Sequence, residues 1–256
     1  MTIAQKLTAL LLGASLLGTS LLLTGCGGGP GRSAQTTLTV FAAASLKGAF
    51  EAMVPGFTAA NPDTRVVFSF QGSQSLVDQL GQGARADVLA TADAGSLARA
   101  TELSLATSPR IFATNTLIII TPVDNPAGIT GLDSSLDGAK VVICDEVVPC
   151  GKATATLARN RGVTLVPVSK EQKVSDVVAK ITIGEGDAGI VYATDAKALG
   201  NDVHTVEIEG ADQVVNTYPI ATVQGAHNAA AAQKFVDHVT SDQGQRVLAD
   251  FGFGTP

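Results

Sequence analysis

The chain has 256 residues, a formal net charge of −6 at pH 7 and only 4% aromatic residues. An acidic chain with so few aromatic rings argues against nucleic-acid binding, which depends on basic surfaces and stacking side chains. Beyond residue 25 no apolar run is long enough to span a membrane.

The first 25 residues have the pattern of a secretory signal peptide. Lys6 is their only charged residue, and an apolar core runs from Leu7 to Leu23. The sequence LLTGC at 22–26 then resembles a bacterial lipobox, whose cysteine becomes the acylated first residue of the mature protein; a short transmembrane helix or a chance cysteine is the alternative. We therefore expect a signal peptide at 1–25, lipid attachment at Cys26, a lipidated tether over 26–36 and a location on the outer face of the cell membrane.

From residue 37 onward, short β-rich runs alternate with helical patterns. Such alternation predicts an α/β fold with mainly parallel sheets flanked by helices, and places the ligand crevice at the carboxyl ends of the strands. The expected strands are 37–42, 65–70, 86–91, 116–121, 139–144, 188–192 and 214–223, and the expected helices are 46–60, 74–82, 94–103, 152–161, 173–183 and 228–250.

Several of the strand-to-helix junctions have small residues and a hydroxyl. VFAAASL at 40–46 carries Ser45 after three alanines, Ser73 follows Gly72, and Tyr192 ends a strand. Each serine could be an ordinary helix N-cap. Together, however, the junctions indicate a site for a small anion, because helix starts expose unpaired N–H groups and small neighbours allow close approach.

Cys144 and Cys150 form a pair if Cys26 carries lipid. They flank DEVVP, and a tight turn around Pro149 would close so short a loop. Metal binding is the alternative, but the three histidines lack ligand spacing, and the cysteine spacing excludes a redox CxxC motif. We expect a structural disulfide and no metal site.

The sequence lacks the signatures of common catalytic sites. GxSxG, HExxH and P-loop motifs are absent. GEGDAG at 184–189 matches GxGxxG, but it precedes a strand instead of opening a helix, so we interpret it as a turn. We expect no enzyme; a lipoprotein hydrolase using Ser45 or Ser73 is the alternative of a different class.

Five segments taken in order carry a family resemblance: VFAAASL, SFQGSQSLVDQL, ADVLATAD, VPCGKA and GIVYATDA. They resemble the motifs of the molybdate-binding proteins of bacterial ABC importers, and the likeness runs from about residue 37 to the end. It implies the two-domain periplasmic binding protein fold with the ligand in a cleft between domains. Domain 1 is expected at 37–114 plus 219–256 and domain 2 at 115–218, with hinge crossings near Asn115 and Tyr218.

The resemblance also implies a ligand set for molybdate or tungstate, with no cofactor. Ser45 and Ser73 should each offer a hydroxyl and a backbone N–H, Cys150 and Val174 a backbone N–H, and Tyr192 its phenol. Family members usually have alanine where this chain has Cys150, and the loop from Cys144 looks one residue shorter than usual.

The implied role is capture of the oxyanion by a monomer that closes around it and delivers it to a membrane ABC permease. A receptor for another tetrahedral oxyanion such as sulfate is the nearest alternative. A sensor or adhesion module on the same fold, with the ligand as a signal, is another.

Overall fold

The computed structural model describes residues 35–256. The expected signal peptide at 1–25, the lipid attachment at Cys26 and nearly all of the expected tether lie outside the described residues. Among the described helices, none combines the length and the apolar character needed to cross a bilayer.

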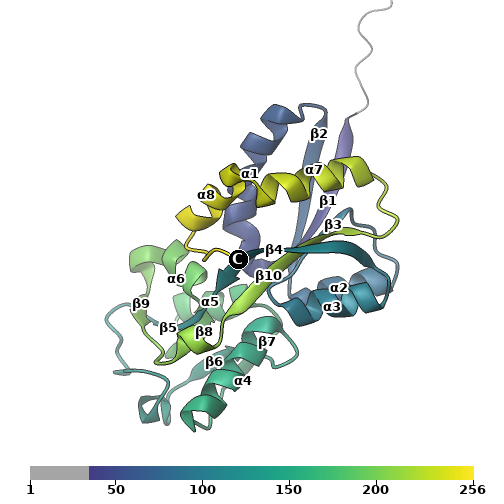
Figure 1. Ribbon diagram of the computed structural model, residues 1–256. Coiled ribbons are helices and arrows are strands. Elements are labelled where there is room, and N and C mark those ends of the chain that lie inside the picture. Colours follow the sequence, from purple (N-terminus) through teal and green to yellow (C-terminus); the bar gives the residue numbers. More distant parts are fainter. Residues whose placement is uncertain (1–34) are drawn as a thin grey trace, which may run out of the picture. The chain divides into compact units, whose positions relative to one another are not determined.

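The described part contains two five-stranded sheets, each with helices beside it (Figure 1). The first sheet has the strand order β2-β1-β3-β10-β4. Its strands are β1 (Thr36–Ala43), β2 (Thr64–Gln71), β3 (Val88–Ala90), β4 (Ala106–Asn115) and β10 (Asn216–Val223), and its helices are α1 (Lys47–Ala60), α2 (Ser73–Gly81), α3 (Ala94–Glu102), α7 (Ala229–Thr240) and α8 (Asp242–Asp250), with the short 3-10 helix η1 (Ala44–Leu46) before α1.

The side chains of β1 alternate between two core clusters, one on each face of the first sheet. Leu38 and Val40 belong to a core cluster with residues of α1 and α7, whereas Phe41 belongs to a second cluster with residues of α2 and α3. Successive strand side chains point to opposite faces. The first sheet is therefore packed with helices on both faces.

The second sheet has the strand order β7-β6-β8-β5-β9. It extends the larger of the two core clusters through apolar strand residues such as Ile119, Val142 and Ile190. Its strands are β5 (Leu117–Thr121), β6 (Val141–Cys144), β7 (Ser169–Glu171), β8 (Ala188–Tyr192) and β9 (His204–Val206), and its helices are α4 (Pro149–Arg161), α5 (Val174–Thr182) and α6 (Ala193–Leu199), with 3-10 turns at Ser134–Leu136, Gly200–Asp202 and Ala211–Gln213.

Both sheets are mixed, which corrects the expectation of mainly parallel sheets. In the first sheet β1 pairs parallel with β2 and β3, whereas β10 pairs antiparallel with β3 and β4. In the second, β6 pairs parallel with β7 and β8, whereas β5 pairs antiparallel with β8 and β9. The reason lies in the chain path: β4 leaves the first sheet and β10 returns to it, so these neighbours run in opposite directions.

The chain passes between the two sheets at two places that lie side by side. β4 ends at Asn115 and β5 begins at Leu117, while β10 begins at Asn216. Asn115 and Asn216 are cross-strand partners. This pair therefore lies where both connections between the sheets run.

The expected helix at 228–250 is two helices. α7 ends at Thr240 and α8 begins at Asp242. Ser241 between them is extended, and its hydroxyl accepts the Gly244 N–H at 3.2 Å as the N-cap of α8.

Candidate functional site

A small cavity lies where strand ends of both sheets meet helix starts. Its volume is about 20 Å³, measured as the space open to the centre of a water molecule, so it admits only an occupant of few atoms. The structure brings all five predicted ligand-binding residues together in its wall. The lining residues are Ala43, Ala44, Ser45, Gln71, Gly72, Ser73, Ala92, Val148, Pro149, Cys150, Lys173, Val174 and Tyr192.

Three helices begin at the cavity without a side-chain cap. The N-cap residues of α2, α4 and α5 are Gly72, Val148 and Lys173, and none of them makes a side-chain cap hydrogen bond. The first N–H groups of a helix lack intrahelical partners, and the helix dipole places positive charge there. The cavity is thus surrounded by backbone donors that a small anion can accept from.

The two predicted serines do not cap helices, which excludes the ordinary N-cap interpretation. Ser73 is the first residue of α2, and its buried hydroxyl oxygen accepts the Ala92 N–H at 3.0 Å. Ser45 lies in η1, with its hydroxyl oxygen 3.0 Å from the Tyr218 phenol oxygen. Both hydroxyls therefore contact the first sheet or a loop beside it, since Tyr218 lies in β10 and Ala92 follows β3.

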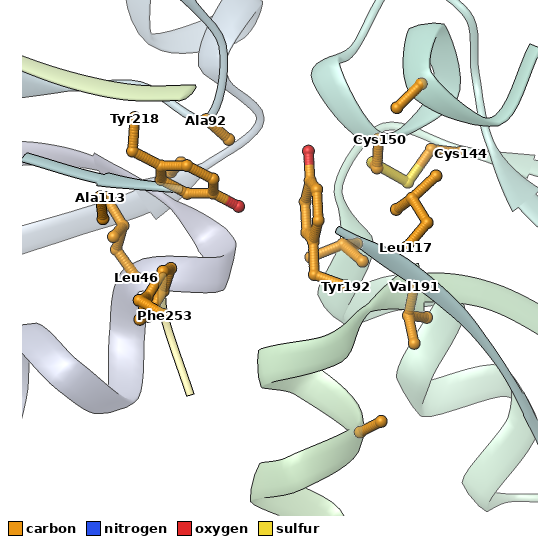
Figure 2. Packing of buried hydrophobic residues seen from close by; sticks show 14 of the residues in the cluster. Leu46, Ala92, Ala113, Leu117, Cys144, Cys150, Val191, Tyr192, Tyr218 and Phe253 are labelled. Atoms are coloured by element: carbon orange, nitrogen blue, oxygen red, sulfur yellow. A yellow bond between two sulfur atoms is a disulfide. The ribbon is translucent and has the colours of Figure 1, made fainter. Parts of the chain in front are cut away.

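Two tyrosines face each other across the junction of the sheets. Figure 2 shows Tyr218 with its hydroxyl directed toward the Tyr192 ring and Tyr192 with its hydroxyl at the upper end of its ring, and the ring centroids are 5.9 Å apart. Burial raises the pKa of both phenols above the usual value. Both therefore keep their protons at physiological pH and can donate hydrogen bonds.

Two asparagines beneath the cavity were missed by the sequence analysis as site residues. Asn216 Nδ2 lies 3.1 Å from the Tyr192 phenol oxygen and 2.9 Å from the Ala92 carbonyl oxygen. Asn115, predicted only as a hinge crossing, donates from Nδ2 to Thr194 Oγ1 at 2.8 Å. No local sequence pattern marks either asparagine, because their contacts depend on the pairing of β4 with β10, which lie far apart in the chain.

Acidic side chains are absent from the residues that line the cavity. Lys173 is the one lining residue with a charged side chain, and its Nζ lies 3.6 Å from the Asp176 carboxylate. Lys152 of α4, which does not line the cavity, forms an ion pair at 3.2 Å with Asp93, the N-cap of α3. The absence of acidic side chains from the wall and the uncapped helix starts around it favour an anion.

The start of α4 is fixed by a disulfide and by a glycine. Cys144, at the end of β6, is bonded to Cys150, the second residue of α4, with their Cα atoms 5.8 Å apart. A Cβ on Gly151 would lie 1.9 Å from the Asp145 carbonyl oxygen, so only glycine fits there. Within residues 35–256, no cluster of three or more potential metal ligands occurs.

A larger cavity lies elsewhere, beside the start of β1. It has a volume of about 500 Å³ by the same measure and is lined by residues including Thr37, Asp87 and His227. It contains none of the predicted site residues, and Asp87 is already satisfied by the N–H groups of Thr39 and Asn228. We therefore place the candidate site at the smaller cavity.

Comparison with known proteins agrees with this architecture. A family model described as bacterial extracellular solute-binding protein matches residues 38–254. The chain belongs to this family. The predicted class, a solute-binding protein and not an enzyme, is thereby confirmed, and an extracellular family agrees with the predicted extracytoplasmic location.

Relatives within the family cover most of this chain. The molybdate-binding protein ModA of Mycobacterium tuberculosis is 41% identical over 230 residues, covering 89% of this chain and 88% of that protein. ModA of Haemophilus influenzae is 30% identical over 251 residues, covering 93% and 96%. The solved periplasmic molybdate-binding protein of Azotobacter vinelandii superposes with a TM-score of 0.76 at 17% identity over 86% of this chain and 99% of that one, which confirms the fold.

Proposed function

We propose that the protein captures molybdate, and equally tungstate, outside the cytoplasm and delivers it to an ABC importer. The observation that carries the proposal is the convergence of neutral donors on one small cavity that no carboxylate lines. The names of the Mycobacterium tuberculosis and Haemophilus influenzae relatives, both molybdate-binding proteins, support the same ligand.

The proposed ligand set consists of Ser45, Ser73, Cys150, Val174 and Tyr192. Molybdate at neutral pH is a fully deprotonated tetrahedral dianion, so its oxygens only accept hydrogen bonds. A protonated phosphate needs an acceptor, and leaving its proton unpaired in a buried site costs about 1–3 kcal/mol. Neutral donors also avoid the desolvation penalty of a buried countercharge.

Binding in this proposal occurs by closure of two domains. Domain 1 comprises 37–114 and 219–256, domain 2 comprises 115–218, and the hinge lies near Asn115 and Tyr218. The pairing of Asn115 with Asn216 supports a hinge there, because both connections between the sheets run side by side. A monomer anchored by lipid at Cys26 would then present the closed form to the permease.

Calorimetric titration of the purified chain without residues 1–26 tests the proposal. We expect molybdate and tungstate to bind more tightly than sulfate, and phosphate to bind weakest. Ser73→Ala and Tyr192→Phe should each weaken molybdate binding about 10-fold, since each removes one hydrogen bond of about 1–2 kcal/mol to a charged ligand.

Ser75→Ala is the matched control, because Ser75 lies on the same helix as Ser73 but does not line the cavity. It should leave the affinity unchanged. Sulfate binding more tightly than molybdate would instead assign the protein to another oxyanion, and turnover of a chromogenic ester lost in Ser45→Ala would assign it to the hydrolase class.

A further inference from the structure

Two buried asparagines, Asn216 and Asn115, contact the phenol oxygens of Tyr192 and Tyr218. We propose that Asn216 and Asn115 are positioning residues that occupy the acceptor oxygens of this network, so that Tyr192 and Ser45 present only protons to the ligand. The inference rests on the proposed function, because it explains how that site would reject an oxyanion that still carries a proton.

The orientation of the Asn216 amide follows from its partners. Its side-chain nitrogen lies 2.9 Å from the Ala92 carbonyl oxygen, and a carbonyl can only accept, so the group facing it must be the NH2. The second hydrogen of that NH2 is donated to the Tyr192 phenol oxygen at 3.1 Å. The phenol thus accepts from Asn216, and in the proposal its own proton, which interacts with Tyr218 in the chain without ligand, is donated to the ligand.

The orientation of the Asn115 amide is fixed in the same way. The Thr116 backbone N–H donates to Asn115 Oδ1 at 3.0 Å, so Nδ2 faces Thr194 Oγ1 at 2.8 Å and the Tyr218 phenol oxygen at 3.4 Å. Tyr218, already an acceptor, lies 3.0 Å from Ser45 Oγ. Either oxygen of this pair can be the donor; in the proposal Tyr218, which already accepts from Asn115, donates to Ser45 and so leaves the Ser45 proton for the ligand.

Ser73 completes the pattern through the backbone. Its Oγ accepts from the Ala92 N–H at 3.0 Å, and a backbone N–H can only donate. Ala92 thereby links Ser73 to Asn216, since its N–H donates to one side chain and its carbonyl accepts from the other. The oxygens of Ser73 and Tyr192 are thus occupied by donors, and in the proposal the Ser45 oxygen is occupied in the same way by Tyr218.

The network also spans the two sheets. Asn216 belongs to β10 of the first sheet and donates to Tyr192 at the end of β8 in the second. Asn115 belongs to β4 of the first sheet and donates to Thr194 in α6 beside the second. In the proposal, Asn115 and Asn216, which lie where the chain passes between the two sheets, therefore set the direction of the hydroxyl protons on both sides. Burial keeps the phenols protonated.

The test replaces the hydrogen-bond donor of Asn216 by a group that only accepts hydrogen bonds. Asn216→Asp has nearly the same shape, but an ionised carboxylate only accepts, so it would draw the Tyr192 proton away from the ligand. Asn216→Leu removes the interaction without reversing it. We expect Asn216→Asp to weaken molybdate binding about 100-fold at pH 8 and to recover part of that loss at pH 6, where a protonated carboxyl can donate again.

Asn216→Leu should weaken binding about 10-fold at both pH values. It should also lower the preference for molybdate over phosphate, because the freed Tyr192 oxygen can then accept the phosphate proton. Asn201→Asp is the control for added negative charge, since Asn201 is exposed and lies outside the cavity wall. Calorimetry with molybdate and with inorganic phosphate at both pH values measures all of these quantities.

The possible results are distinguishable. If the wild-type chain fails to bind molybdate, the proposed function fails whatever the variants do. If the wild type binds and Asn216→Asp and Asn216→Leu show the same loss at both pH values, the positioning role is overturned. Should Asn216→Asp not fold, an unchanged molybdate-to-phosphate preference in Asn216→Leu and Asn115→Leu overturns it equally.

Discussion

Asp195 shows how a single residue can make this fold sensitive to pH. It is the third residue of α6, and its carboxylate accepts the Tyr192 N–H at 3.1 Å. Burial raises the pKa of this carboxyl from 3.8 to about 7, while the hydrogen bond from Tyr192 opposes the shift. The folded protein therefore holds a proton there between about pH 4 and 7 that the unfolded chain does not bind.

The sign of the effect follows from this difference in proton binding. Because the folded state binds more protons, the free energy of unfolding falls as pH rises from about 4 to about 7 and stays reduced above that range. Asp195→Asn keeps an oxygen for the Tyr192 N–H but cannot ionise. The variant should lack this decline.

We therefore expect Asp195→Asn to gain stability relative to wild type as the pH increases. One pKa unit corresponds to about 1.4 kcal/mol, and the side chain keeps partial contact with solvent, so the relative gain between pH 5 and pH 8 should be about 1–2 kcal/mol. Urea denaturation at both pH values measures it, with Asp202→Asn as an exposed control. Equal pH profiles for wild type and Asp195→Asn would contradict the assignment.

At the residue scale, the sequence identified the groups that line the cavity but not the groups behind them. Ser45, Ser73 and Tyr192 follow strand ends, and a local pattern is enough to place such residues at one edge of a sheet. Asn216 and Asn115 are brought together by the pairing of β10 with β4, in which these two partner residues are 101 positions apart in the chain. No local pattern specifies that register, so their contacts required the structure.

At the element scale, the start of α4 depends on its disulfide. The bond closes a loop between residues 6 apart in sequence, from the end of β6 to the second residue of α4. Loop-closure entropy for so short a loop corresponds to about 2 kcal/mol of stability. It also restrains the Cys150 N–H, which is a proposed ligand donor.

Replacing both cysteines by alanine should therefore have two effects. The free energy of unfolding should fall by about 2 kcal/mol, and molybdate affinity should fall by a few-fold, since the donor must be ordered on binding. Thermal unfolding and calorimetry measure the two effects separately. Unchanged stability would show that the bond adds no constraint; unchanged affinity would show that the Cys150 amide is ordered without it.

The elements themselves were predictable where their apolar pattern was strong. The expected strand at 188–192 coincides with β8, and the expected helix at 173–183 lies within one residue of α5 at either end. β4 was missed because its residues 107–111 are mostly exposed and include Pro109, so no apolar run marks it. α6 was missed because seven residues give too little periodicity.

At the scale of the whole molecule, Gly72 marks a close approach of the two sides of the cavity. It is the N-cap of α2 beside the first sheet, and a Cβ built on it would lie 2.3 Å from the carbonyl oxygen of Gln172, which follows β7 of the second sheet. A backbone oxygen cannot move aside as a side chain can. The observed arrangement is therefore accessible only without a side chain at this position.

Gly72→Ala should leave each side folded but hold the two sides apart. The N-cap has φ −62° and ψ 140°, a conformation that alanine adopts without strain, so the substitution acts through the contact with Gln172 and not through the backbone of α2. If binding requires closure, we expect molybdate affinity to fall at least 10-fold, with little change in thermal stability of the unliganded protein.

Small-angle X-ray scattering separates closure from direct loss of a ligand contact. Wild type should become more compact when molybdate is added, whereas Gly72→Ala should not, even at molybdate concentrations that saturate its weakened site. Ser73→Ala, the neighbouring variant, should lose affinity yet still compact once saturated, because it removes a donor without adding bulk between the sides. Compaction of Gly72→Ala equal to that of wild type would show that the contact between Gly72 and Gln172 does not limit closure.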